Sequence, residues 1–326
     1  MTFANFPKPF SGGITIQGMP ITMAFATGQR SLGNTALTGV WWVDSANGLD
    51  GNNQGTYVLP LKTLGRALAL ATANDIIMLK PGHAETISSA TAASGAWNVA
   101  GVSIVGLGVG GQRPSFTLDT ATTSTINVSA ANMSVTNCQF IANFAAIVAL
   151  FTITTAIGFS FYNNVVADTA SNKNFLAIFV TDATANHADK LLVDSNKFYL
   201  LATSGVVQLY QPGAGADQVV INNNFWSTPT TNAAAAIALS TFAHTNFLVT
   251  NNIFNMTNIA ATATAIIITG TGASTGFVYN NLAFSVANAG GTTNLLFTTG
   301  TGLRFHGNYT SDTADTSMYL LPVADS

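Results

Sequence analysis

Charge is what this sequence lacks most. Only 7% of its 326 residues are Asp, Glu, Lys or Arg, against about 25% in an ordinary soluble domain. Ten basic and thirteen acidic side chains give a net charge of -3, and no basic stripe is present that could neutralise phosphates, so nucleic acid is not an expected partner. The 86 residues from 218 to 303 contain no charged side chain. Any groove on those turns would have neither a carboxylate nor an ammonium group for catalysis.

Cysteine and long apolar runs are scarce as well. Cys138 is the single cysteine, which excludes an internal disulfide framework and a cysteine-based zinc site. Apolar residues make up 48% of the chain, but Thr, Asn, Ser and Gly interrupt them long before the ~20 residues of a membrane-spanning helix. The N-terminus, MTFANFPKPF, also lacks the basic and apolar regions of a secretory signal. We therefore expect no membrane insertion, and we expect the protein to be made in the cytoplasm.

A repeat of about 29 residues organises most of the chain. A short strand pattern followed by Asn, and usually by an aromatic residue, recurs at steps of 26 to 32 residues. Its anchor positions are Ile77, Ile104, Val135, Phe161, Val193, Val220, Val249, Val278 and Phe305. A second apolar segment lies between successive anchors, for example AIFVTDA and AIIITGT. These segments are too short for helices and are bounded by turn residues.

Such a unit cannot bury its own apolar face, so neighbouring units must stack. The pattern predicts an all-β protein, a right-handed parallel β-helix of about nine turns. Leucine-rich repeats have similar periods, but their LxxLxL frame is missing. Recurrent asparagines two residues past each anchor are typical of left-handed corners and of stacked side-chain amides. We expect this structural Asn ladder to consist of Asn137, Asn163, Asn222, Asn251 and Asn280.

The chain divides into four parts on this reading. Residues 1–37 form an irregular N-terminal arm, 38–75 a first strand and a capping helix, 76–310 the β-helix, and 311–326 a C-terminal cap or tail. Leu61, Leu64, Leu68 and Ala71 make an apolar stripe on the helix predicted for Pro60 to Ala73. The arm is rich in Pro and Gly and suits docking onto another protein. Its expected anchoring residues are Phe3, Phe6, Pro7, Pro9, Phe10, Ile14 and Ile16.

Several local motifs indicate a family. The turn VDSANG, the Pro before KTL and the strand DIIMLKPG resemble the start of the β-helix in the pectate-lyase-like superfamily. The run PGHAETI and the segments after it are similar to β-helix proteins encoded beside bacteriophage structural genes. The resemblance covers about residues 40 to 305 and implies the fold and a phage origin. It does not assign a biochemical role, because one fold hosts many functions.

The best candidate for chemistry is the segment TDATANHADKLLVDS, in the longest step of the repeat. It holds Asp182, His187, Asp189, Lys190 and Asp194. Glycoside hydrolases need paired carboxylates, so an enzymatic site would lie here; a solvated loop is the simpler interpretation. His83 and Glu85 form a second His–carboxylate pair that we expect to be structural. We expect no catalytic residues, no metal and no cofactor.

The resulting hypothesis is a non-enzymatic structural protein of a tailed-phage virion, a capsid decoration or head-fibre subunit. It would sit on the virion exterior, on the capsid rather than the tail, and bind capsid protein or another virion protein through its arm. The near absence of charge favours burial against identical copies, and the phage resemblance implies a trimer. The alternatives are a tailspike-like polysaccharide depolymerase and a glycan-binding adhesin that holds a host surface glycan with Trp226, Tyr210 or Tyr199.

Overall fold

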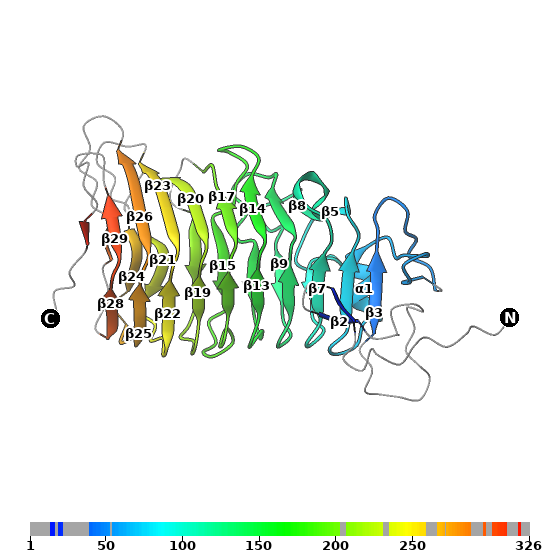
Figure 1. Ribbon diagram of the computed structural model, residues 1–326, viewed down its shortest axis with the longest axis horizontal. Coiled ribbons are helices and arrows are strands. Elements are labelled where there is room, and N and C mark those ends of the chain that lie inside the picture. Colours follow the sequence, from blue (N-terminus) through cyan, green and yellow to red (C-terminus); the bar gives the residue numbers. More distant parts are fainter. Residues whose placement is uncertain are drawn as a thin grey trace.

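Three parallel sheets wind around one long core. The structure is a computed structural model that describes residues 14–16, 19–21, 39–52, 54–202, 207–230, 235–258, 266–270, 272–287, 296–297, 302–311 and 319–320. The chain passes from the first sheet to the second and then the third, and returns to the first one turn further along (Figure 1). The predicted all-β parallel β-helix is confirmed.

The first sheet contains ten strands. They are β3 (Val40–Val43), β4 (Ile76–Leu79), β7 (Ser103–Gly106), β10 (Ser134–Thr136), β13 (Ser160–Tyr162), β16 (Leu192–Asp194), β19 (Val220–Asn222), β22 (Phe247–Thr250), β25 (Gly276–Tyr279) and β28 (Leu303–His306). Nine of the ten contain a predicted anchor.

The second and third sheets complete each turn. The second sheet contains β5 (Ala84–Ile87), β8 (Ser115–Leu118), β11 (Gln139–Ala142), β14 (Val165–Asp168), β17 (Lys197–Tyr199), β20 (Phe225–Thr230), β23 (Ile253–Asn258), β26 (Leu282–Ala287), β29 (Tyr309–Ser311) and β30 (Tyr319–Leu320). The third contains β6 (Ala96–Trp97), β9 (Ile126–Val128), β12 (Phe151–Ile153), β15 (Ala177–Thr181), β18 (Gln208–Gln211), β21 (Ala235–Ser240), β24 (Ile266–Gly270) and β27 (Leu296–Phe297).

The register of the first sheet corrects one anchor. Val193 pairs with Ile221, and Ile221 pairs with Val249, so the inward position of β19 is Ile221 and not the predicted Val220. Ile221 is fully buried, whereas Val220 faces outward and is half-buried. Three apolar residues in a row, Val219 to Ile221, carry no alternation, so the sequence could not set this register.

Aromatic side chains fill the middle of the core. Phe151 stacks on Phe179 of the next turn at 5.5 Å between ring centroids, and Phe116 stacks on Phe140 at the same distance. Trp97 packs edge-on against Phe151. All five side chains are fully buried. These columns arise because parallel in-register strands place the same position of each turn directly above that of the last.

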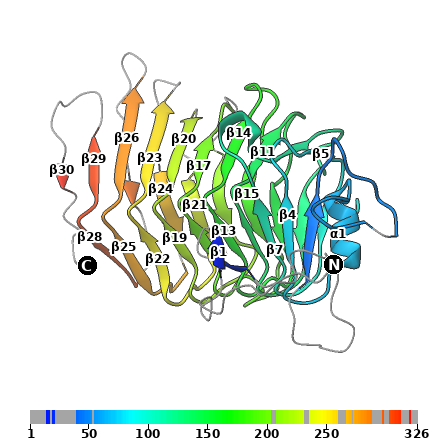
Figure 2. The same cartoon turned by 45° about the vertical axis from the view of Figure 1, so that its right-hand side comes forward.

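The N-terminal end of the core is closed by helix α1 (Leu64–Leu70), which lies beside β3 (Figures 1 and 2). It buries Leu64 and Leu68, as predicted. The helix is shorter than the predicted segment because Thr63 caps its start and Ala71 is already extended. Leu61 precedes it and bridges Val43. A short 3₁₀ helix, η2 (Gly110–Gln112), follows β7.

Little of either terminus is described. In the arm, β1 (Ile14–Ile16) and β2 (Met19–Ile21) form an antiparallel hairpin, which corrects the expectation of a wholly irregular segment. Ile14 and Ile16 lie in this hairpin; the other expected anchoring residues lie outside the described residues. At the C-terminus, β30 pairs antiparallel with β29. In the part of the chain that the structure describes, no helix has the length and apolar character needed to span a membrane.

Candidate functional site

The predicted cluster of titratable residues lies where the chain turns from β15 to β16. Asp182 and His187 meet there, with 2.9 Å between Asp182 Oδ2 and His187 Nδ1. Asp182 Oδ1 also accepts a hydrogen bond from the backbone N–H of Thr184. The two side chains are 29% and 27% exposed. A His–carboxylate pair of this kind could transfer protons, and here it lies in a partly exposed turn at the surface.

The other three members of the cluster have separate partners. Asp189 Oδ1 accepts a hydrogen bond from the backbone N–H of Asp217 on the next turn. Lys190 has a left-handed backbone, with φ at 60°, and its N–H donates to the carbonyl of Asp217. Asp194 Oδ1 accepts from Asn222 Nδ2 at 2.7 Å. Among the described residues, no hydrogen bond or ion pair joins these three to Asp182 or His187.

Every described carboxylate accepts hydrogen bonds from the protein itself. Three of the thirteen acids, Asp312, Asp315 and Asp325, lie outside the described residues. The remaining ten each accept at least one hydrogen bond from a nearby backbone or side chain, and they are Asp44, Asp50, Asp75, Glu85, Asp119, Asp168, Asp182, Asp189, Asp194 and Asp217. No three His, Cys, Asp or Glu residues of the described chain gather as metal ligands would.

Two of these carboxylates organise the N-terminal cap. Glu85 accepts a hydrogen bond from the backbone N–H of Leu64, at the start of α1, and another from the Ser94 hydroxyl. His83 Nε2 lies 2.8 Å from Glu85 Oε1, while His83 Nδ1 accepts from the backbone N–H of Ser45. The pair therefore ties α1 to the first turn, which is the structural role expected for His83 and Glu85.

A buried asparagine ladder joins the first sheet to the second. Asn224 Nδ2 donates to the carbonyls of Val193 and of the Asn252 side chain, and Asn224 Oδ1 accepts from the backbone N–H of Asn196. The same pattern repeats in each turn. The ladder consists of Asn164, Asn196, Asn224, Asn252, Asn281 and Asn308, all at most 2% exposed. Cys138 occupies the preceding position, and its N–H donates to Asn164 Oδ1.

The buried ladder lies one residue after most of the predicted asparagines and two residues after Asn222. Two of the predicted side chains do bond to each other, since Asn251 Nδ2 donates to Asn222 Oδ1 at 3.1 Å. Asn137, Asn163, Asn251 and Asn280 do have left-handed backbones, as expected of corner residues. Asn222 does not: it ends β19, and Asn223 holds the corner. The fully buried amides follow directly after these corners. A signal was available, because the column after the corner is Asn in six of seven repeats, whereas the corner column also admits Ser195 and Gly307.

Burial shifts the pKa values of two groups in the core. Asp168 replaces an apolar residue in the column that holds Leu118 and Ala142. Desolvation raises the pKa of Asp168 to about 6, and backbone N–H groups, including that of Leu201, partly oppose the shift. Desolvation also lowers the pKa of His244, which is fully buried with its Nε2 3.3 Å from the Tyr210 hydroxyl. Asp168 ends β14, and His244 lies between β21 and β22.

Two of the aromatic residues considered for sugar stacking are inaccessible. Trp226 and Tyr210 are fully buried because both occupy inward positions of their strands, and this corrects the expectation that they are exposed. Tyr199 is 45% exposed on the second sheet, and its ring lies 5.8 Å from that of Phe225.

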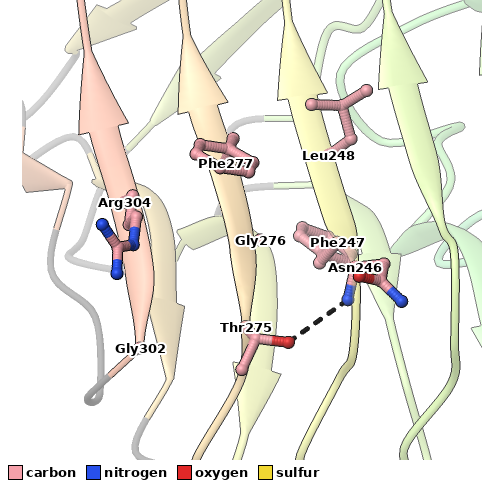
Figure 3. A pocket seen from close by; sticks show the side chains of 8 residues that line it. All are labelled: Asn246, Phe247, Leu248, Thr275, Gly276, Phe277, Gly302 and Arg304. Carbon is pink, nitrogen blue, oxygen red and sulfur yellow. Dashed lines mark hydrogen bonds between the residues drawn. The ribbon is translucent and has the colours of Figure 1, made fainter.

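A hollow of about 540 Å³ lies on the outer side of the first sheet near its C-terminal end (Figure 3). Phe277, Leu248, Asn246, Thr275 and Arg304 surround the bare backbone of Gly276. Gly276 has φ at 142°, and a Cβ there would lie 1.9 Å from the Phe247 carbonyl oxygen, so only glycine fits. Arg304 is the single charged residue of the lining. Sequence analysis did not single out this site, since its residues come from three turns.

Comparisons with known proteins bear on the fold alone. No protein family model and no curated protein matches the chain. A solved rhamnogalacturonan lyase is 12% identical over 86% of this chain and 89% of its own, with a TM-score of 0.42. The GH136 lacto-N-biosidase from Eubacterium ramulus is 10% identical over 83% of this chain and 67% of its own, with a TM-score of 0.32. At these identities no residue role is transferred.

Proposed function

We propose that this chain is a non-enzymatic structural protein of a tailed-phage virion. It serves as a capsid decoration or head-fibre subunit, with the N-terminal arm bound to the shell and the β-helix as the outward body. The observation that carries the proposal is the use of the carboxylates. Each described one accepts a hydrogen bond from the protein itself, whereas a glycosidase leaves two carboxyl groups facing a substrate groove.

The arm supports the mode of attachment. Its hairpin, β1 and β2, forms a sheet of its own that is not part of the three sheets of the body. The phage-like motifs, PGHAETI and the segments after it, belong to the first turns of the body. The proposal thus separates an anchoring segment, residues 1–37, from a body that folds by stacking its own turns.

Immunogold labelling of purified virions tests the location. We expect label over the capsid. A chain lacking residues 1–37 should retain the circular dichroism of the parent and lose its attachment to virions that were assembled without the protein. A chain lacking residues 321–326 is the control and should still attach. Attachment of the arm-deleted chain, or absence of the protein from virions, would overturn the proposal.

The Asp182–His187 pair favours a second candidate, a depolymerase at the tail. This candidate predicts label at the tail tip, clearing of host capsular polysaccharide by the purified protein, and loss of that activity in His187→Ala. Clearing that His187→Ala abolishes would replace the structural proposal with the enzymatic one.

A further inference from the structure

Two apolar stripes face outward from neighbouring sheets. The first stripe, on the first sheet, consists of Leu192, Val220, Leu248 and Phe277, which pair in register on consecutive strands. The second stripe, on the second sheet, consists of Phe225, Ile253, Leu282 and Tyr309, also paired in register. Phe277 is 53% exposed and Tyr309 45%. Three turns carry a member of both stripes.

Three earlier turns present hydroxyl groups at the positions of the first stripe. Its outward column holds Ser103, Ser134 and Ser160 directly before Leu192, and Val40 and Ile76 beside the cap. The column of the second stripe is mixed before Phe225, and it consists there of Ala84, Ser115, Gln139, Val165 and Lys197. Among the described strands, consecutive turns with a large apolar residue in both columns occur only from β19 to β26. Contiguous exposed apolar surface of this kind marks an interaction site.

The charges at the ends of the stripes are complementary at the same level. Lys197 precedes Phe225 in the second column, on the turn where Asp194 lies beside Leu192 in β16. Arg304 follows Phe277 in the first column, on the turn where Tyr309 ends the second stripe. Between these ends the stripes carry no charge. An acid thus lies level with a base, and a guanidinium lies level with an aromatic ring.

We infer that the two stripes are the two halves of one interface, in which the first sheet of each copy packs against the second sheet of the next. A rotation about an axis parallel to the solenoid keeps every turn at its own level. It sets Asp194 against Lys197 of the neighbouring copy, and Arg304 against Tyr309 as a cation–π pair. The hollow beside Phe277 then receives side chains of the second stripe.

This arrangement is favoured over a two-fold pairing. A dimer whose two-fold axis is perpendicular to the solenoid covers the first stripe with itself or the second with itself, and leaves the other stripe in water. A head-to-tail contact that closes into a ring buries both stripes in every copy. The corner between the two sheets, which would face the ring axis, has no charged residue of its own: it consists of Asn163, Ser195, Asn223, Asn251, Asn280 and Gly307. The Arg113 guanidinium bonds to the first of these, Asn163, which precedes the turns of the stripes. Charged groups there would be costly to bury.

Light scattering on the purified protein tests the interface independently of any role in a virion. We expect a closed oligomer at micromolar concentration, three copies being the number that the phage resemblance implies. Leu248→Lys and Ile253→Lys should each give a folded monomer, verified by circular dichroism. Ser134→Lys adds the same charge in the same column outside the stripe and should keep the parent mass. A monomeric parent, or oligomers in both stripe variants, would overturn the inference.

Cross-linking distinguishes the ring from two-fold pairing. Val220→Cys and Phe225→Cys chains, produced together and treated with a short bismaleimide, should give a mixed dimer that neither chain gives alone. Cys138 is fully buried, and burial raises the pKa of its thiol to about 12, so it should not react and the parent serves as the control. Efficient self-linking of Val220→Cys alone would refute the head-to-tail interface in favour of a two-fold one.

Discussion

The early and late turns of the solenoid have the same backbone path but are held by different chemistry. In the early turns, carboxylates such as Asp75, Glu85 and Asp168 bind the N–H groups of neighbouring segments. In the late turns, which include the charge-free residues 218–303, the side-chain carbonyls of buried amides such as Asn252 and Asn281 accept from backbone N–H groups, and their amide nitrogens donate to backbone carbonyls. A carboxylate can only accept unless it is protonated, whereas an amide both donates and accepts at any pH. The late turns can therefore repeat one ladder without charge.

The largest effect should come from breaking the amide-held part. Asn224→Ala removes the partners of the Val193 carbonyl and of the Asn196 N–H, both buried. We expect a loss of about 3–5 kcal/mol in the free energy of unfolding, measured in urea, because buried groups left unpaired cost their full desolvation. Asn223→Gly removes a neighbouring exposed amide at a corner with φ at 54° and should change stability little. Equal losses in both variants would contradict the ladder's role.

A pH titration sharpens the comparison on the carboxylate-held side. Asp168 has its pKa raised from 3.8 to about 6 in the folded protein, so the folded state binds the proton more tightly than the unfolded state. The resulting stabilisation is complete below pH 4 and is lost as the pH rises through about 6. The parent should lose about 2–3 kcal/mol between pH 4 and 7, and Asp168→Asn should lose clearly less. Parallel stability curves for the two proteins would contradict this assignment.

A smaller effect is expected at the edge of the early turns. Lys80 Nζ lies 3.8 Å from Asp44 Oδ2 and 4.5 Å from the centroid of the Tyr57 ring. Lys80→Met keeps most of the contact with the ring and removes the ion pair. The free energy of unfolding should fall by at most about 1 kcal/mol, and the difference should shrink in high salt. A loss several times larger would mean that charge dominates in this part of the chain.

The smallest effect should come from the Asp182–His187 pair. The two side chains are partly exposed and bond only within their own turn. Asp182→Asn and His187→Ala should each unfold at the same urea concentration as the parent and attach to virions equally well. A clear shift of the unfolding midpoint in either variant would show that this pair contributes to the stability of the β-helix and would contradict the prediction.

The fold could be predicted because each turn of the solenoid repeats the same pattern of apolar and turn residues in the sequence. Eight of the nine anchors lie at the inward positions of their strands, since a stacked turn needs one apolar residue there. Positions whose role depends on orientation were harder. Val220 and Asn222 each miss by one residue, because VVINNN offers several equivalent registers. The inward orientation of Trp226 and Tyr210 was also missed, because an aromatic residue suits either face of a strand.

The candidate sites were less predictable than the fold. The segment 182–194 could be recognised by composition, but only the structure shows that Asp182 meets His187 while Asp189 and Asp194 bond to neighbouring turns. The hollow around Gly276 draws on residues 246 to 304, which only the stacking brings together. The two stripes are visible as columns once the register is known and are scattered in the linear sequence.

Because the turns stack at a fixed spacing, the number of repeats sets the length of the body. The strands of each turn pair only with those of the turn before and the turn after it, so gain or loss of one whole repeat leaves the pairing of the other strands intact. One repeat of 26 to 32 residues changes the length by about 4.8 Å, the spacing between paired strands. Evolution of such a gene can therefore change the length of the β-helix in fixed increments. The two ends and their binding partners stay unchanged.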